Sequence, residues 1–278
     1  MDLTRFLNWT HFNIDETLPG SAWGTGGIGL ADFDGDGDLE VAISRRETRT
    51  AYWYDRKDDA HWDRHIIGSA EGLERTLGAA ALDIDGDGWV DLVFNGVWFK
   101  NPGNLAQNPD VPWEAQPFAG GGHDIIAADL NADGRLDIVT YNGNILAWYD
   151  TSRDLVQTII AQGYDHHGGI APHGVGDLNG NGWLDLVIPG FWFENPGKGL
   201  GEWRRHPWPH VAVPKASYGT SMRAWIADLN GDGWNDIVYS DCDTGYSHVY
   251  WVENHGQGLE WTLHRLPDPP GDERTGSF

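Results

Sequence analysis

Residues 83–94 read DIDGDGWVDLVF, with four carboxylates and two glycines in nine residues, followed at once by an apolar run. The same pattern, D-x-[DN]-x-[DN]-G-x-x-[DE], begins again at Asp32, Asp129, Asp177 and Asp228. The five starts lie 46 to 51 residues apart. A period of about 40 to 50 residues is typical of one four-stranded blade of a β-propeller. The sequence therefore predicts a repeat protein rather than one acidic site.

Each repeat shows the same internal order around its acid-rich loop. A strand of small residues precedes the loop, and a strand rich in branched residues follows it, as expected for buried β-structure. A fourth, outer strand ends each unit. The third strand carries a tryptophan in every unit, namely Trp53, Trp98, Trp148, Trp192 and Trp251. We expect these rings to pack between blades. The fold class predicted is all-β, a propeller of four-stranded blades with five complete repeats.

The repeats also predict the domain limits. The blades of this single domain are expected at about 22–68, 69–118, 119–161, 162–209 and 210–267. Residues 1–21 include NWTHFNID, which is similar to an outer strand without inner strands before it. Residues 268–278 are similar to the segment that leads into a blade. We therefore expect a ring of six or seven blades that is cut short in this chain, with a closed ring of five blades as the alternative.

Composition excludes several classes of partner. Forty-two acidic against eighteen basic residues give a formal net charge of −24. Nucleic acid and anionic membrane surfaces would be repelled, whereas metal cations are natural partners. A single cysteine, Cys242, allows no internal disulfide and no cysteine-based zinc site. We see no apolar run long enough to span a membrane and no signal peptide.

The acid-rich loops suit a hard divalent cation. Calcium takes six to eight oxygen ligands, and loop positions one, three and five can point inward when a glycine at position six allows a sharp turn. Position seven can offer its carbonyl and the acid at position nine both its oxygens. A catalytic dyad would not occur in five copies, and a phosphate loop would not be lined by carboxylates. A solvated acidic turn is the alternative. The sequence predicts up to five calcium ions, bound more weakly by loops with fewer charges, such as the fourth.

These loops and the strands after them resemble the FG-GAP/VCBS repeats, calcium-loop β-propellers that include integrin-type heads. The resemblance implies metal ligands at Asp32, Asp34, Asp36, Asp38 and Glu40; at Asp83, Asp85, Asp87 and Asp91; at Asp129, Asn131, Asp133 and Asp137; at Asp177, Asn179, Asn181 and Asp185; and at Asp228, Asn230, Asp232 and Asp236. The WYD or WFENPG segments followed by W-x-x-H resemble a subgroup found in microbial carbohydrate-active propellers, including polysaccharide lyases and sugar dehydratases.

Chemistry is expected at the mouth of the central channel, just upstream of the loops. The candidate catalytic residues are His123, His173, Arg223 and Tyr218. The candidate substrate-binding residues are Arg75, Asp124, Tyr164, His166, His167 and Lys215. Arginine can pair with a uronate carboxylate while His or Tyr removes the neighbouring proton, as β-elimination requires. Two alternatives stay open, namely hydrogen bonding of His123 and His173 between blades and a transition-metal site at His166, His167 and His173.

Two functional hypotheses follow. The first is a calcium-stabilised propeller that binds, and cleaves by β-elimination, an acidic polysaccharide at the channel mouth. The second is a non-enzymatic, integrin-like module that binds a protein partner. Calcium loops of extracellular modules are filled at about 10⁻⁴–10⁻³ M. That affinity favours a secreted or periplasmic location.

Overall fold

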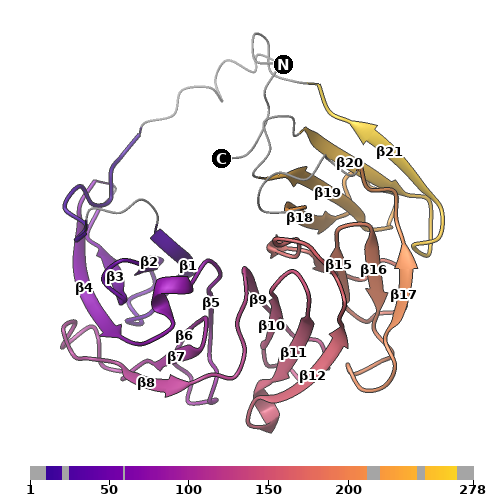
Figure 1. Cartoon of the computed structure of the whole chain (residues 1–278). Helices are drawn as coiled ribbons and strands as arrows, with labels where there is room; N and C mark the ends of the chain where they lie inside the picture. The colour runs from indigo at the N-terminus through magenta and orange to yellow at the C-terminus, as the bar shows by residue number, and fades with distance from the viewer. Residues whose placement is uncertain (1–10, 21–24, 59, 212–219, 243–247, 268–278) are drawn as a thin grey trace.

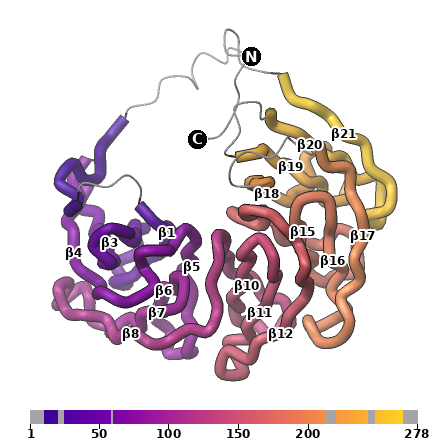
Figure 2. Tube along the Cα trace, viewed as in Figure 1, coloured from indigo at the N-terminus to yellow at the C-terminus, as the bar shows by residue number. Residues whose placement is uncertain are grey.

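The computed structural model describes residues 11–20, 25–58, 60–211, 220–242 and 248–267. These residues form antiparallel sheets that are arranged around a common centre, as blades of a β-propeller (Figure 1). In each blade the chain runs from the centre outwards, so that β4, β8, β12, β17 and β21 lie at the rim (Figure 2). The predicted all-β propeller with five repeats is confirmed. No helix in the described residues is long and apolar enough to cross a membrane.

The blades follow one another along the chain. The first contains β1 (Thr25–Ala31), β2 (Glu40–Arg45), β3 (Thr50–Arg56) and β4 (Trp62–Ser69). The second contains β5 (Ala80–Leu82), β6 (Asp91–Phe94), β7 (Val97–Lys100) and β8 (Glu114–Pro117). The third contains β9 (Asp124–Ala128), β10 (Asp137–Tyr141), β11 (Leu146–Asp150) and β12 (Val156–Ala161). The fourth contains β14 (Val175–Gly176), β15 (Asp185–Ile188), β16 (Phe191–Glu194) and β17 (Arg204–Pro207). The fifth contains β18 (Met222–Ala227), β19 (Asp236–Asp241), β20 (Val249–Asn254) and β21 (Trp261–Arg265). Two short 3-10 turns lie at η2 (Leu73–Arg75) and η3 (Thr151–Arg153).

Each acid-rich loop connects the inner strand of a blade to the second strand. The glycine at position six has a positive φ in every copy, for example 93° at Gly88. Glycine adopts this left-handed conformation without steric cost, so the chain can turn back between two paired strands. Trp53, Trp148 and Trp192 are fully buried, and the last two contact the backbone of the following blade, as expected. Trp98 and Trp251 are only half-buried.

The inner strand of the fourth blade differs from the simple repeat. The sequence predicts one strand of small residues directly before the fourth loop. Instead, β14 pairs with β15, while the preceding β13 (Pro172–His173) pairs in parallel with β18 of the fifth blade. Gly174 alone separates them; its N–H donates to the carbonyl of Ile170 at 2.7 Å, and its carbonyl accepts the N–H of Val187 at 3.0 Å. The segment before β14 therefore links the third and fifth blades.

The N-terminal segment does not form the predicted outer strand in its described part. Residues 11–20 contain no strand. Instead, the Asp15 carboxylate accepts hydrogen bonds from the Tyr54 hydroxyl at 2.9 Å and the Arg64 guanidinium at 2.6 Å. Leu18 packs on the apolar cluster of the first blade. Side-chain contacts rather than strand pairing thus attach this segment to the first blade. Residues 1–10 and the predicted lead-in at 268–278 lie outside the described residues.

Candidate functional site

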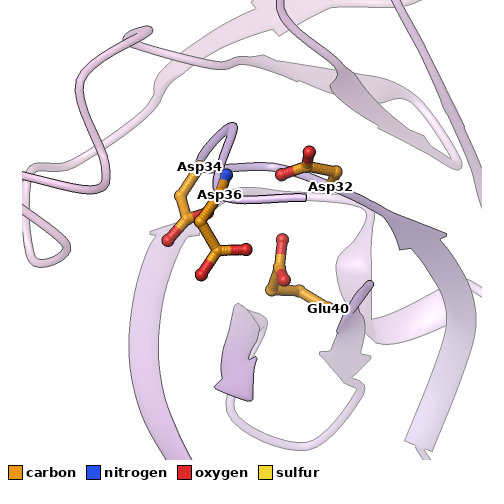
Figure 3. Close-up of side chains that lie close together, drawn as sticks. All are labelled: Asp32, Asp34, Asp36 and Glu40. Carbon is orange, nitrogen blue, oxygen red and sulfur yellow. The ribbon is translucent and has the colours of Figure 1, made fainter. Parts of the chain in front are cut away.

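The first acid-rich loop brings four carboxylates together. Oxygens of Asp32, Asp34, Asp36 and Glu40 all lie within 4.8 Å of one another, around a common space (Figure 3). A donor set made only of carboxylate oxygens is the kind that calcium prefers. Asp38 does not belong to this cluster; its carboxylate lies 3.4 Å from the Arg56 guanidinium. The residues of the first loop therefore fit a hard divalent cation.

The acid at loop position nine is buried in every copy and hydrogen-bonds to the backbone. Asp91 accepts the N–H of Ile84 at 3.0 Å and that of Asn101 at 2.8 Å. Asp137, Asp185 and Asp236 make the same pair of contacts, and Glu40 accepts the N–H of Phe33. The sequence predicted that both oxygens of this acid bind the cation. In the structure, the oxygens accept backbone hydrogen bonds that connect the start of the loop to the end of the third strand.

Burial makes the charged form of four of the position-nine acids, Glu40, Asp91, Asp137 and Asp185, unfavourable without a nearby cation. It raises the pKa of Glu40, Asp91 and Asp185 to about 7 and that of Asp137 to about 6. The backbone hydrogen bonds lower these pKa values only in part. A cation at loop positions one to five would favour the carboxylate form, because opposite charge stabilises it.

The second loop has a positive charge of its own. Asp83, Asp85 and Asp91 lie within the same 4.8 Å of one another. The Lys100 ammonium contacts the carboxylate of Asp85 and lies 2.8 Å from that of Asp87. The corresponding residues, two positions after the third-strand tryptophan, are acidic in the other blades: Asp55, Asp150, Glu194 and Glu253. By charge count alone this loop should be a strong site, but Lys100 neutralises part of that charge.

Replacement of Lys100 by glutamate, the residue at this place in the fourth and fifth blades, is therefore expected to strengthen cation binding to the second loop. We expect calcium affinity of this loop to rise about tenfold or more, because an ammonium is exchanged for a further carboxylate. Titration calorimetry with calcium measures the change. Lys198→Glu, the same charge change in another blade, is the control. Equal affinities in parent and Lys100→Glu would contradict the role assigned to Lys100.

The other three loops have the same backbone but fewer charges. Their first aspartates, Asp129, Asp177 and Asp228, accept the N–H of the glycine at position six at 2.9, 2.7 and 2.9 Å. Asparagine replaces aspartate at Asn131, Asn179, Asn181 and Asn230. Within the described residues, clusters of three or more acids occur in the first two loops alone. Side-chain amide oxygens still offer neutral ligands for calcium in the other three.

A second candidate site lies at the centre of the propeller. A cavity of about 940 Å³ is lined by the inner strands β1, β5 and β9 together with His123, Pro172, Arg223 and Ser240. Its walls from the first two blades are mostly glycine and alanine. The cationic and titratable groups therefore face the cavity from the third and fifth blades. This asymmetric arrangement is suited to binding a ligand at one side of the channel.

Asp124 organises this side of the cavity. Its carboxylate accepts the backbone N–H groups of Gly169, Ile170 and Ala171 at 2.6, 2.8 and 3.1 Å. The other oxygen contacts His123 Nδ1 at 2.7 Å and Arg223 at 2.9 Å. The sequence predicted a substrate contact for Asp124, but the residue is fully buried. It is a positioning residue for His123 and Arg223.

The charge of Asp124 is stable over the ordinary pH range. Burial alone would raise its pKa. The hydrogen bond from His123, the charge of Arg223 and the backbone N–H groups outweigh burial and lower the pKa to about 2. The carboxylate therefore stays ionised and accepts hydrogen bonds only. Nδ1 of His123 must carry the proton in that contact, which leaves Nε2 of the neutral ring as the basic atom.

The remaining histidines have separate partners. His166 Nδ1 lies 2.6 Å from the Tyr141 hydroxyl, and Tyr164 packs beside it. The His167 ring lies 4.4 Å from that of His123, and the exposed His173 ring lies 4.8 Å from that of Trp225. Among the described residues no histidine belongs to a cluster with metal-ligand spacing, so the transition-metal alternative is not supported. The alternative of hydrogen bonds between blades concerned His123 and His173, and His123 contacts Asp124 of its own blade instead.

Other predicted residues lie away from this cluster. Arg75 is in η2, with its side chain 81% exposed and near Glu74. Lys215 and Tyr218 lie outside the described residues. Sequence reasoning missed the backbone of residues 169–171, which holds Asp124. The run GGIAP in that segment was a usable signal, because small residues allow close backbone approach.

A family model for the FG-GAP-like repeat matches the first acid-rich loop, the second loop and the strands between them. The match spans residues 32–94. The later loops of the chain share the residue pattern of this FG-GAP-like repeat. No curated protein matches the chain in sequence.

Several solved structures are similar in fold. A lectin from Agrocybe aegerita that recognises non-reducing terminal N-acetylglucosamine is 19% identical, with a TM-score of 0.55, over 90% of this chain and 68% of the lectin. The V. cholerae biofilm matrix protein Bap1 is 16% identical, with a TM-score of 0.47, over 88% of this chain and 40% of Bap1. The fucose-specific lectin of Aleuria aurantia is 14% identical, with a TM-score of 0.45, over 88% of this chain and 79% of the lectin. At 19% identity the likeness to the Agrocybe aegerita lectin concerns the fold alone.

Proposed function

We propose that this protein is a calcium-stabilised β-propeller that binds an acidic carbohydrate at the mouth of its central channel. The observation that carries the proposal is the cluster in which buried Asp124 holds both His123 and Arg223 at the wall of the central cavity. The Arg223 side chain is 43% exposed and so keeps donors for a ligand. The fold likeness to a lectin that recognises N-acetylglucosamine is in keeping with a carbohydrate ligand.

The arrangement of charges favours an acidic sugar. The chain is strongly acidic overall, and Arg223 is a local cation at the cavity wall whose charge Asp124 balances in part. A guanidinium can pair with a carboxylate through two parallel hydrogen bonds. Glycine and alanine on β1 and β5 leave the opposite side of the cavity open to a polymer chain. A uronate could therefore rest its carboxylate on Arg223.

The same geometry supports cleavage by β-elimination. Arg223 would stabilise the negative charge that develops on the uronate carboxylate, and Nε2 of His123 would accept the proton from the adjacent carbon. The electron pair of that C–H bond forms a carbon–carbon double bond as the glycosidic C–O bond breaks. The leaving oxygen then takes up a proton. Calcium bound in the loops would supply stability and no step of this reaction.

Replacing Arg223 with alanine is expected to weaken binding of an acidic oligosaccharide about 10- to 100-fold, because a charge-assisted hydrogen bond contributes about 1.5–3 kcal/mol. Arg223→Lys should retain part of the affinity, since it keeps the charge but not the paired donors. Equilibrium binding of oligogalacturonate, measured in calcium, is the test. Absorbance of unsaturated uronate products in the same samples reports cleavage, which His123→Ala should abolish.

The outcomes separate the two functional classes. Binding without unsaturated product would support a carbohydrate-binding propeller and contradict the lyase activity. Absence of binding across a panel of acidic polysaccharides, by a folded and calcium-loaded protein, would contradict the proposal altogether. That result would favour the protein-interaction module.

A further inference from the structure

The third-strand tryptophans are covered in a regular way, by the residue that faces them on the outer strand. Histidine is that residue in three blades. The His65 ring lies 4.8 Å from Trp53, and the rings of His206 and His264 stack on Trp192 and Trp251 at 4.2 and 4.5 Å. Trp53 and Trp192 are fully buried under this cover, so their rings offer little surface to a ligand.

A second cover comes from the next blade, through the connection between its third and fourth strands. Gly199 lies so close to Trp148 that an added Cβ would come within 2.5 Å of the ring. The carbonyl of Gly258 accepts the indole N–H of Trp192 at 3.1 Å. A close backbone contact of this kind needs a loop long enough to reach the neighbouring blade. Nine residues separate β16 from β17, and six separate β20 from β21.

Trp98 lacks both kinds of cover. The residue opposite it on β8 is Gln116 rather than histidine. The connection of the next blade is short, because only five residues separate β11 from β12. This connection is held compactly at its start, where the Asp150 carboxylate accepts the N–H and the hydroxyl of Ser152 at 3.0 and 2.7 Å. A cavity of about 590 Å³ opens between the second and third blades, with half-buried Trp98 in its wall.

The cavity combines aromatic surface with polar groups. Tyr149 lies in its wall beside Trp98, while Gln116, Arg135 and Asp154 also line it. Several of these groups are fixed by their neighbours. Arg135 donates to the carbonyl of Ile84 at 2.9 Å, and the Tyr149 ring packs edge-on against Phe118 at 4.8 Å. Its volume falls within the range of small-molecule sites, about 300–1,000 Å³.

We propose that this inter-blade cavity binds one neutral pyranose ring of a saccharide. A pyranose presents C–H groups on its faces, which can rest on the Trp98 indole, and hydroxyls around its edge, which can pair with Gln116, Arg135 and Asp154. A purely apolar ligand would leave those polar groups unpaired. Lys100 neutralises part of the charge of Asp85, and Arg135 and Asp154 carry opposite charges, so the lining has little net charge and suits a neutral sugar. The site is separate from the central cavity and does not rest on the function proposed there.

The test introduces at Trp98 the histidine that packs on the tryptophan in three other blades. Gln116→His places on β8 the residue that covers the ring in three other blades, and it should close the site without unfolding the protein. Ligand-observed NMR with a panel of methyl pyranosides, including the gluco, galacto, manno, fuco and 2-acetamido-glucose forms, measures binding. We expect at least one pyranoside to bind the parent. Its affinity for Gln116→His should be lower by about tenfold or more. Asp154→Asn, which suits the left-handed backbone at φ 53°, should also weaken binding by removing the charged acceptor, while the melting temperature stays unchanged.

Two controls locate the site. Arg153→Ala alters the same connection outside the cavity lining, and Arg223→Ala alters the central cavity; neither should change pyranoside affinity. The proposal is overturned if no pyranoside of the panel binds or if Gln116→His binds as tightly as the parent. It is also overturned if Arg223→Ala abolishes binding, because the sugar would then occupy the central cavity.

Discussion

Removal of calcium is expected to lower the melting temperature of this protein by on the order of 10 °C or more, and its return should restore the original value. A site with free calcium at about 100 times its dissociation constant stabilises the fold by about 2.7 kcal/mol, and several loops should contribute. The physical reason is local. Burial raises the pKa of position-nine acids such as Asp91 and Asp185 to about 7. A nearby cation would favour their carboxylate form and so stabilise the folded protein.

Thermal unfolding followed by circular dichroism, first with EDTA and then with excess calcium, measures this effect. Magnesium is a useful comparison, because it prefers a smaller and more rigid octahedral site and should restore stability less well. Asp129→Asn, at the first position of the third loop, should reduce the calcium-dependent shift. Asp110→Asn, on an exposed side chain, should leave the shift intact. Equal melting temperatures with EDTA and with calcium would contradict a structural role for the ion.

Asp124→Ala is expected to destabilise the protein by about 3–5 kcal/mol, because three backbone N–H groups lose a charged acceptor and each such hydrogen bond contributes about 1.5–3 kcal/mol. The carboxylate is fully buried and accepts three backbone N–H groups as well as His123 and Arg223. Without it, the N–H groups of residues 169–171 lose their acceptor in a buried setting. These residues join the third blade to the segment that pairs with the fifth, so packing between blades should weaken as well.

Urea denaturation of parent and variant gives the change in free energy of unfolding. Asp110→Ala provides a matched control, because Asp110 also accepts from a histidine, His65, but its side chain is 81% exposed. That variant should unfold at nearly the parent urea concentration. A loss of less than about 1 kcal/mol in Asp124→Ala would contradict the organising role assigned to Asp124.

The fold was largely predictable from sequence, because its determinants are local and repeated. The spacing of Asp83, Asp85 and Gly88 specifies a tight turn between strands. Its repetition every 46 to 51 residues specifies the blades. The regular tryptophans mark the third strand in each unit, and all five lie there in the structure. Where the repeat is broken, as at Pro172–His173, pairing with a distant strand replaced the local pattern.

The candidate sites were less predictable, because they depend on contacts between distant residues. Nothing local to Asp124 indicates that it accepts from residues 169–171 of the next blade. Its position beside His123 suggested a ligand contact, whereas the buried carboxylate instead positions His123 and Arg223. Lys100 is a similar case. It follows the second loop by nine residues and reaches Asp85 because the third strand returns beside the loop.

Trp98 is accessible because two features of the other blades are missing around it, and a comparison of the blades is needed to see this. The histidine that covers other tryptophans is replaced by Gln116, and the connection from the third blade is short. Either feature alone would leave the ring partly covered. Together they turn a packing residue into the wall of a cavity.

A crystal structure of the protein grown in calcium with trigalacturonate would test most directly where ligand and metal bind. The result expected is a uronate carboxylate within hydrogen-bond distance of the Arg223 guanidinium, with the calcium ions confined to the acid-rich loops. Uronate carboxylates bound to the calcium ions of those loops, with the central cavity free of sugar, would contradict the assignment of ligand recognition to His123, Asp124 and Arg223.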